Sequence, residues 1–495
     1  MAVADGTVRW LGDDESARIR IEGVDEVVEL EGALVTPAFV DAHVHATSAG
    51  LLLDGLDLTR TASLRECLDT VARHAAARTG SVLWGHGWDE SRWPEARPPS
   101  RAELDRAAAG AAVYLSRVDV HSAAVSSALL ERAPQALDAD GASPDGPLSR
   151  QAHRHARRAA HEAMTPGQRR DAQRAFLAHA AAQGIAVVHE CAGPDISGAD
   201  DLADLLAVDA GVEVVGYWGQ AVTTAAQAAE LLAATGAHGL AGDLCCDGAL
   251  GSRTAALREP YADAPGERGA TYLDRDAVAA HVVSCTRAGT QAGFHVIGDA
   301  ATETVIAGFA AAEARLGAAA LQARTHRLEH LEMVEAGQAA QLARWGVVAS
   351  VQPGFDAAWG GPGGMYAVRL GAERARGMNP FATLARAGVT LAFGSDTPVT
   401  PVDPWAAVRA AVHHTAGAGI TPRAAWHAHT IAGYRAAAAA GATGTLVPGA
   451  PASYAVWGTE PDLDAPSGPA PGCLRTVHAG RTIFDTDGLR RQPTH

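Results

Sequence analysis

Two histidines at alternate positions, His43 and His45, end the segment Pro37–His45, which is otherwise largely apolar. Such a segment predicts a buried strand, and alternate residues of a strand point to the same side. The two imidazoles therefore project together at the carboxyl end of the strand. Two imidazoles in that arrangement are suited to a divalent metal ion such as Zn²⁺.

Other predicted strands carry residues of the same chemistry. His295 lies within an apolar strand, His330 ends a second, and Asp396 follows a third. A lone His or Asp at a strand end is usually structural, but four histidines and an aspartate at the ends of four strands are hard to explain by packing. The sequence therefore predicts a metal site made of His43, His45, His295, His330 and Asp396.

The elements that must position these residues are short apolar strands alternating with Ala-rich helical stretches, which is typical of βα units and a parallel sheet. Ten strands are predicted in the middle of the chain, at Ala38–Ala42, Val82–Gly85, Ala112–Leu115, Ile185–Val188, Val212–Val215, Asp243–Cys246, Gly293–Val296, Arg327–Glu329, Val347–Val351 and Thr390–Phe393. A closed βα barrel needs only eight strands, and its chemistry lies at their carboxyl ends. The strands that begin at Val82 and Ala112 are therefore assigned to an insertion.

The predicted fold class is α/β, a (β/α)8 TIM-type barrel over residues 37–440 with an α/β insertion at about residues 65–150, after the first barrel strand. Alternating runs at Ala17–Glu22 and Glu26–Leu30 predict short half-buried strands, and the C-terminal segment has the same pattern. Residues 1–36 and 441–495 are therefore expected to form one small β-sandwich domain.

The net charge, the cysteine spacing and the length of the apolar runs limit the partners and the location that can be expected for this protein. The net charge of −16 argues against a nucleic-acid or anionic-membrane partner, because phosphate binding needs a basic surface. The six cysteines show no C-x-x-C spacing, and no apolar run reaches the roughly 18 residues of a membrane span. We expect a reduced, cytoplasmic protein that acts on a small molecule, and a homodimer remains an open alternative to a monomer.

With these segments described, the chain resembles the amidohydrolase superfamily and, within it, the YtcJ-like branch. The resemblance is carried by several motifs spread over nearly the whole chain: Pro37–His45, Leu83–Asp89, Cys246–Ala255, His295–Asp299, Arg327–His330 and Gly394–Asp396. Any one of them is a weak signal, whereas the combination is specific.

The resemblance implies a barrel with an appended β-domain and hydrolysis of an amide or cyclic amide C–N bond by a metal-bound hydroxide. It implies that the five residues named above hold the metal, and that Asp396 also acts as general base and acid. His330 or His295 would stabilise the oxyanion if it is not a ligand.

The sequence departs from this branch at one important position. Many members carry a Lys in the strand before the Asp-Gly pair, and its carbamate bridges two metal ions. Here that position holds Asp243, and all 40 basic residues are Arg, so a lysine carbamate cannot form. Asp243 is shorter than a carbamylated Lys, and we expect it not to reach the same point. Glu190, at another strand end, is the alternative bridge, and one Zn²⁺ ion is favoured.

Four further residues are candidates for substrate binding. Arg253 follows a strand end and can face the substrate or form a structural salt bridge. His121 and Trp88 line the pocket mouth or pack in the core, and Asp247 lies in the Asp-Gly motif. The charged run Gln151–Arg158 is predicted to be a solvated helix face.

Two alternatives stay open. The first is a mononuclear deaminase of a nucleobase-like substrate, although such enzymes usually have a Glu shortly after the third His, and Val296–Asp299 contains none. The second is an inactive metal-binding relative that serves as a scaffold, which is disfavoured because all five ligand positions are occupied.

Overall fold

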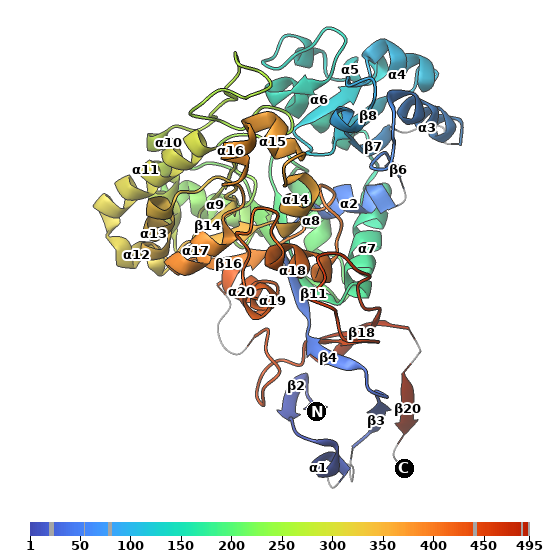
Figure 1. Cartoon of the computed structure of the whole chain (residues 1–495), viewed down its shortest axis with the longest axis vertical. Coiled ribbons are helices and arrows are strands. Elements are labelled where there is room, and N and C mark those ends of the chain that lie inside the picture. Colours follow the sequence, from blue (N-terminus) through green and yellow to red (C-terminus); the bar gives the residue numbers. More distant parts are fainter. Residues whose placement is uncertain (19–23, 54, 78–81, 439–442, 487–488, 494–495) are drawn as a thin grey trace.

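The computed structural model describes residues 1–18, 24–53, 55–77, 82–438, 443–486 and 489–493. Figure 1 shows a large α/β body with a smaller lobe below it, and both chain ends lie in this lobe. None of the described helices is long and apolar enough to cross a membrane.

Seven parallel strands form two sheets in the large body. One sheet has the order β12–β11–β5 and the other β13–β14–β15–β16. Their bounds are β5 (Phe39–Val44), β11 (Ile185–Ala192), β12 (Glu213–Trp218), β13 (Gly293–Val296), β14 (Arg327–His330), β15 (Val348–Val351) and β16 (Thr390–Phe393). Most of these residues are buried on both faces, as expected for parallel strands covered by helices.

Isolated parallel bridges connect the two sheets on both sides. On one side Gly239 bridges to Tyr217 of β12, and Leu240 bridges to Ala292 beside β13. On the other side Thr397, which follows β16, bridges to Val44 of β5. The strand predicted at Asp243–Cys246 is therefore wrong, because only Cys245 makes a bridge there, to His295. Gly242 has φ +74°, which turns the chain before a regular strand can form.

Helices connect these strands and cover the sheets. They are α2 (Ala46–Leu53), α7 (Pro166–Ala182), α8 (Ala199–Leu206), α9 (Ala225–Thr235), α10 (Arg275–Ala288), α11 (Asp299–Leu316), α12 (Ala318–Gln322), α13 (Ala336–Arg344), α14 (Pro353–Trp359), α15 (Met365–Leu370), α16 (Ala372–Ala375), α17 (Phe381–Ala387), α18 (Pro404–Val412), α19 (Pro422–Ala428) and α20 (Ile431–Ala436). Their ends follow local rules: Thr165 and Gln168 form a capping box at the start of α7, and Gly289 ends α10 with φ +82°.

The insertion between α2 and α7 has a five-stranded sheet of its own, in the order β10–β9–β8–β7–β6. Its strands are β6 (Leu56–Asp57), β7 (Leu83–Trp88), β8 (Val113–Arg117), β9 (Ser122–Val125) and β10 (Leu148–Ser149), and its helices are α3 (Leu64–Ala77), α4 (Arg101–Ala107), α5 (Ser127–Leu130) and α6 (Arg150–Glu162), with short 3₁₀ turns at Glu90–Arg92 and Pro134–Leu137. The strands predicted from Val82 and Ala112 are β7 and β8 of this sheet.

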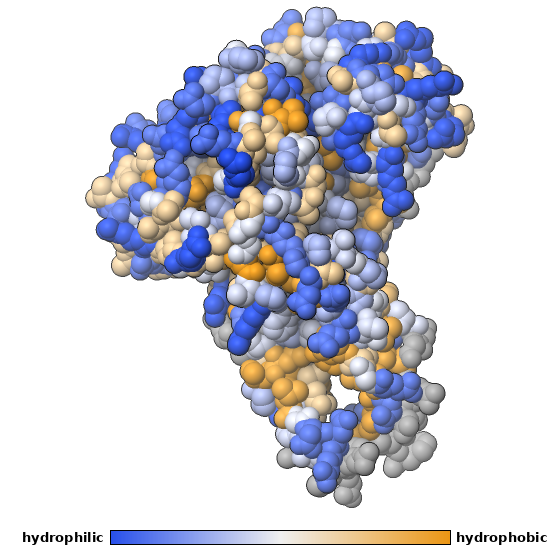
Figure 2. Space-filling model, in the orientation of Figure 1, coloured by the Kyte–Doolittle hydropathy of each residue, from blue (hydrophilic) through white to orange (hydrophobic). Residues whose placement is uncertain are grey.

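The small lobe joins the two ends of the chain. Strand β4 (Leu34–Pro37) pairs antiparallel with β17 (Tyr454–Trp457), which continues to β18 (Cys473–His478) and β19 (Arg481–Asp485). Two further pairs, β1 (Ala2–Ala4) with β2 (Thr7–Trp10) and β3 (Glu26–Glu29) with β20 (Arg490–Pro493), lie beside this sheet (Figure 1). Figure 2 shows hydrophilic and hydrophobic residues intermingled over the face in view, with hydrophobic residues gathered on the small lobe.

One predicted strand of the N-terminal segment is not observed. Asp14–Arg18 forms helix α1, so Ala17 and Arg18 are helical, and the rest of the run Ala17–Glu22 lies outside the described residues. The strand predicted at Glu26–Leu30 is confirmed as β3.

Candidate metal centre

The five predicted ligands converge at the carboxyl ends of the parallel strands. His43 lies near the end of β5 and His45 just after it, and their Nε2 atoms are 3.3 and 3.2 Å from Oδ1 of Asp396. The rings of His295 and His330 are 4.4 Å apart, and the ring of His330 is 5.0 Å from that of His43. The structure thus brings together the five residues that the sequence predicted to meet, and their role as metal ligands stays a prediction.

Asp243 lies among all four histidines, contrary to the expectation that it is too short. Its Oδ1 is 3.5 Å from His43, 3.6 Å from His295 and 3.7 Å from His330, and its Oδ2 is 3.1 Å from His45. The short side chain reaches the site because the backbone itself approaches: the turn at Gly242 passes close enough that a Cβ there would lie 3.0 Å from that of Cys191.

Glu190, predicted as the bridging residue, is not part of any ligand group found among the described residues. One of its carboxylate oxygens accepts a hydrogen bond from the backbone N–H of Ala46 at 2.7 Å. Burial raises its pKa to about 7 although His45 opposes the shift. Asp243 therefore occupies the position that the sequence interpretation gave to Glu190.

A buried pair of charged residues orients His43. The Nδ1 atom of His43 is 2.9 Å from Oε2 of Glu329, and Arg327 donates to both oxygens of that carboxylate at 2.6 and 2.9 Å. All three side chains are buried. A carboxylate behind a metal-facing imidazole fixes the ring and its tautomer, so this contact leaves Nε2 directed at Asp243 and Asp396.

His330 and His295 are held in a similar way. Nδ1 of His330 is 2.8 Å from Oε1 of Gln352, and Nε2 of His295 is 3.4 Å from the carbonyl oxygen of Gly248. The opposite nitrogen of each ring faces Asp243. His330 and Asp396 have φ +72° and +54°, a backbone region that non-glycine residues adopt at a cost of about 1–3 kcal/mol and that is common in functional sites.

The residues present fit a divalent metal ion. Nε2 of His43, Oδ1 of Asp243 and Oδ1 of Asp396 are buried and have no hydrogen-bond partner among the described residues. Two compact ligand groups, His43–His45–Asp243 and Asp243–His295–His330, share the Asp243 carboxylate. Buried donor atoms of imidazole and carboxylate type without partners are what a Zn²⁺ or similar ion requires.

The electrostatics agree with this arrangement. Burial opposes protonation of His45, but its contacts with Asp243 and Asp396 raise its pKa to about 9. Burial alone would raise the pKa of Asp396, yet His43 and His45 keep it well below its ordinary value. The carboxylates therefore stay ionised. Their negative charge favours either protonated histidines or a metal cation beside them.

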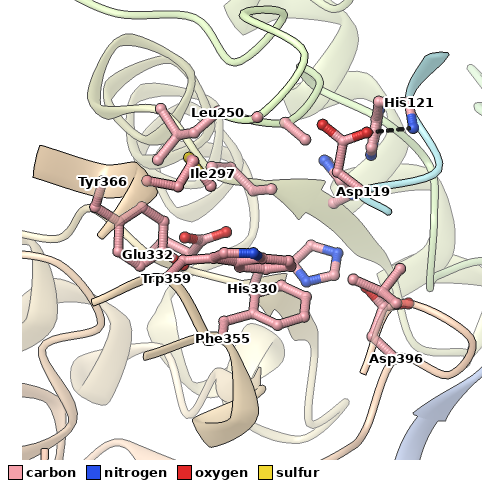
Figure 3. A pocket seen from close by; sticks show the side chains of 15 residues that line it. Asp119, His121, Leu250, Ile297, His330, Glu332, Phe355, Trp359, Tyr366 and Asp396 are labelled. Carbon is pink, nitrogen blue, oxygen red and sulfur yellow. Dashed lines mark hydrogen bonds between the residues drawn. The ribbon is translucent and has the colours of Figure 1, made fainter. Parts of the chain in front are cut away.

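A cavity opens onto this cluster. His295, His330 and Asp396 line one part of it, and the remaining walls are mostly apolar. Figure 3 shows Phe355, Trp359 and Tyr366 gathered near His330, with Glu332 among them. Burial raises the pKa of Glu332 to about 7, while the Tyr366 hydroxyl opposes the shift. These residues could not be predicted from the sequence, because the helices α14 and α15 that carry the aromatics show no motif.

Three of the four predicted substrate-binding residues lie elsewhere. Arg253 forms an ion pair with Asp263 at 2.7 Å and lines neither of the described cavities. Trp88 is buried and donates from Nε1 to the carbonyl of Leu115.

Asp247 accepts hydrogen bonds from the backbone N–H groups of Ala256, Ile297 and Gly298, and is fully buried. Its role is therefore structural. His121 alone lies as predicted: it lines the cavity, and its ring is 4.9 Å from that of His295.

The chain is similar to several known proteins. A sequence model described as the amidohydrolase family matches residues 26–484. The chain is 26% identical to "Putative amidohydrolase YtcJ" of Bacillus subtilis (strain 168), over 83% of this chain and 79% of that protein. It is 30% identical to an N-substituted formamide deformylase of Arthrobacter pascens, over 26% of this chain and 24% of that protein.

A solved structure of similar shape is an uncharacterized metal-dependent hydrolase from Pyrococcus furiosus. The two chains are 25% identical with a TM-score of 0.70, and the alignment covers 92% of this chain and 94% of the other. The family match spans nearly the whole chain and includes every residue of the cluster. This chain belongs to the amidohydrolase family.

Proposed function

We propose that this protein is a metal-dependent hydrolase that cleaves the C–N bond of an amide or cyclic amide. The observation that carries the proposal is the position of Asp396, whose Oδ1 lies 3.3 Å from His43 and 3.2 Å from His45 and has no hydrogen-bond partner among the described residues. A carboxylate at such a point can both bind a metal ion and exchange a proton with a water molecule beside it.

The favoured cofactor is one tightly held Zn²⁺ ion. His43, His45, Asp243 and Asp396 would hold it, and Asp243, His295 and His330 offer a second, weaker position. Bound there, a divalent ion would lower the pKa of a coordinated water toward about 7 and would polarise the substrate carbonyl.

The protein's own groups then manage the proton and the developing charge. Asp396 accepts the proton of the attacking water and returns it to the leaving nitrogen. His121 stays neutral because burial and the neighbouring His295 hold its pKa well below the ordinary value. As a neutral imidazole beside the cluster, it can donate one hydrogen bond to the substrate carbonyl oxygen.

We also propose that the two parallel sheets and the bridging segment at Gly239–Cys245 complete one closed (β/α)8 barrel. The bridges that connect β12 to β13 and β16 to β5 support this closure. A barrel would explain why ligands from distant parts of the chain meet at one end of the strands.

The deformylase relative acts on N-substituted formamides according to its name. Because its match covers only part of the chain, it serves to choose substrates and not to assign one. N-formyl compounds therefore belong in the first screen, with lactams and N-acyl amines.

The test uses protein reconstituted with Zn²⁺ or Mn²⁺ and screened for amine release, with Asp396→Asn as the variant. We expect the variant to lose about 10²–10⁴-fold in kcat, the usual contribution of a general base. The control is Asp171→Asn, a carboxylate exposed at the surface of α7. Activity of Asp396→Asn near the wild-type level would contradict the proposed mechanism, and release of free ammonia from nucleobase-like compounds alone would favour the deaminase alternative.

A further inference from the structure

A second cavity, larger than the first, also borders this cluster. Asp243 lines it, together with Cys245 and Tyr272, whereas His295, His330 and Asp396 line only the first cavity. His121 is the one residue common to both. A substrate whose reacting bond lies at the metal cluster can thus extend into two separate cavities.

Three arginines of α6 line this second cavity, Arg150, Arg154 and Arg157. They are spaced by four and three residues, so they share one face of the helix. Arg154 lies 3.6 Å from Asp195 and over the ring of Tyr272 at 5.0 Å, and Arg150 pairs with Asp140 at 3.3 Å. The helix predicted to present a solvated face instead directs this side toward a cavity beside the metal centre.

Arg157 differs from the other two. It is 7% exposed and makes no ion pair or hydrogen bond with any described residue, and its Nε atom, like that of Arg150, is buried without a partner. The other buried arginines of the described chain do have partners; Arg117, for example, pairs with Asp89, Glu90 and Asp119. A buried guanidinium without a counter-charge is strongly unfavourable, and such groups are normally paired.

The remaining titratable groups of the cavity do not supply a counter-charge. Asp195 already pairs with Arg154 and Arg158 at 3.6 and 2.9 Å. His153 is neutral because burial and the nearby arginines lower its pKa, and Asp243 is surrounded by the four histidines. The cavity therefore has an excess of positive charge on the α6 side.

We propose that Arg157, supported by Arg154 and Arg150, binds an anionic group of the substrate, a carboxylate or a phosphoryl group. The inference rests on the proposed hydrolase function and narrows its substrate class. The substrate is an amide with an anionic group on one side of the scissile bond and an apolar group on the other. The apolar group would lie in the first cavity, against Phe355 and Trp359. A guanidinium recognises a planar carboxylate through two parallel hydrogen bonds.

The first experiment compares matched N-acyl amino acids with the corresponding carboxamides and aminophosphonates, using the metal-loaded enzyme. Hydrogen bonds to a charged group contribute about 1.5–3 kcal/mol, so we expect kcat/KM for one or both anionic series to exceed that for the carboxamides by roughly 10–100-fold. The variant Arg157→Gln should lose this preference, because kcat/KM for the anionic series should fall by a similar factor relative to the carboxamides. The ratio of kcat/KM for the carboxylates to kcat/KM for the phosphonates identifies which anion the site prefers.

Two controls keep the result interpretable. Arg174→Gln alters an exposed arginine of α7 that lines neither cavity and should leave the preference intact. Arg157→Lys retains the positive charge and should keep part of the preference for anionic substrates. Equal loss of activity on charged and neutral substrates in Arg157→Gln, with unchanged metal content, would overturn the proposal.

A binding measurement separates this inference from the hydrolase function. Calorimetric titration of 3-phenylpropionate and 3-phenyl-1-propanol tests whether the carboxylate is recognised without any reaction. One outcome is that no amide is cleaved, while 3-phenylpropionate binds the wild type and does not bind Arg157→Gln. In that case the anion site is supported and the hydrolase proposal fails. If amides are cleaved with no charge preference and 3-phenylpropionate binds the wild type and Arg157→Gln equally, the anion site is refuted and the hydrolase proposal stands.

Discussion

Oδ1 of Asp243 lies 3.5 Å from Nε2 of His43, although one residue follows a tight glycine turn and the other lies in a buried strand. The same carboxylate approaches His45, His295 and His330. One short acidic side chain thus lies close to all four histidines, in a chain that contains no Lys.

The first prediction concerns this carboxylate. Asp243→Asn keeps the shape of the side chain and removes its charge, so metal affinity should fall by at least about tenfold, and any second ion should be lost first. Metal bound per chain, measured by mass spectrometry after reconstitution and dialysis, checks this. The exposed-site variant Asp171→Asn is the control, and an unchanged metal content in Asp243→Asn would rule out a ligand role.

The second prediction concerns the residues behind His43. Glu329→Gln should weaken metal binding by about 10–100-fold, because Glu329 fixes the His43 ring at 2.9 Å. It should also lower the thermal midpoint, since Arg327 loses a buried counter-charge, a change that destabilises by about 3–5 kcal/mol. Chelator competition and calorimetry measure the two effects. Glu335→Gln, which breaks an exposed ion pair with Arg258, should change neither.

The third prediction tests how tightly the strand ends are packed. A Cβ at Gly394 would lie 2.5 Å from the backbone nitrogen of His43 and 2.8 Å from its Cβ. Gly394→Ala should therefore displace His43, destabilise the protein by about 1–3 kcal/mol and abolish tight metal binding. Gly337→Ala is the matched control, because nothing lies within 4 Å of a Cβ built there. Normal metal affinity in Gly394→Ala would show that the site tolerates the shift.

The fourth prediction concerns pH and stability. Burial, assisted by Arg157, lowers the pKa of His161 to about 3, and neither ring nitrogen has a hydrogen-bond partner among the described residues. Between about pH 6.5 and 3 the unfolded chain binds a proton at this residue that the folded chain does not. The free energy of unfolding must therefore fall as the pH falls through this window.

His161→Phe removes that proton uptake and keeps the ring packed against Trp84, 4.8 Å away. The variant should be more stable than the wild type by about 1–3 kcal/mol at pH 7, because two unpaired buried nitrogens are lost, and by more at pH 5. Thermal midpoints at both pH values measure this. His155→Phe on the same helix is the control, and an equal pH dependence in wild type and His161→Phe would contradict the assignment.

Much of the metal centre could be predicted from the sequence because strand geometry is local. The period of two places His43 and His45 on one face, and parallel strands bring their carboxyl ends together. His295, His330 and Asp396 follow from the same reasoning. The orientation of each ring could not be predicted this way, because it depends on partners such as Glu329 and Gln352 from other strands.

The sequence by itself determined that histidines and an aspartate end several buried strands, and that no lysine carbamate can form here. Only the tertiary structure decided that Asp243 and not Glu190 enters the cluster, and that Arg157 lies buried beside it. The physical reason is that the reach of a side chain depends on the path of the backbone that carries it. That path is set by turns such as Gly242 and by packing between distant segments, which no local period encodes.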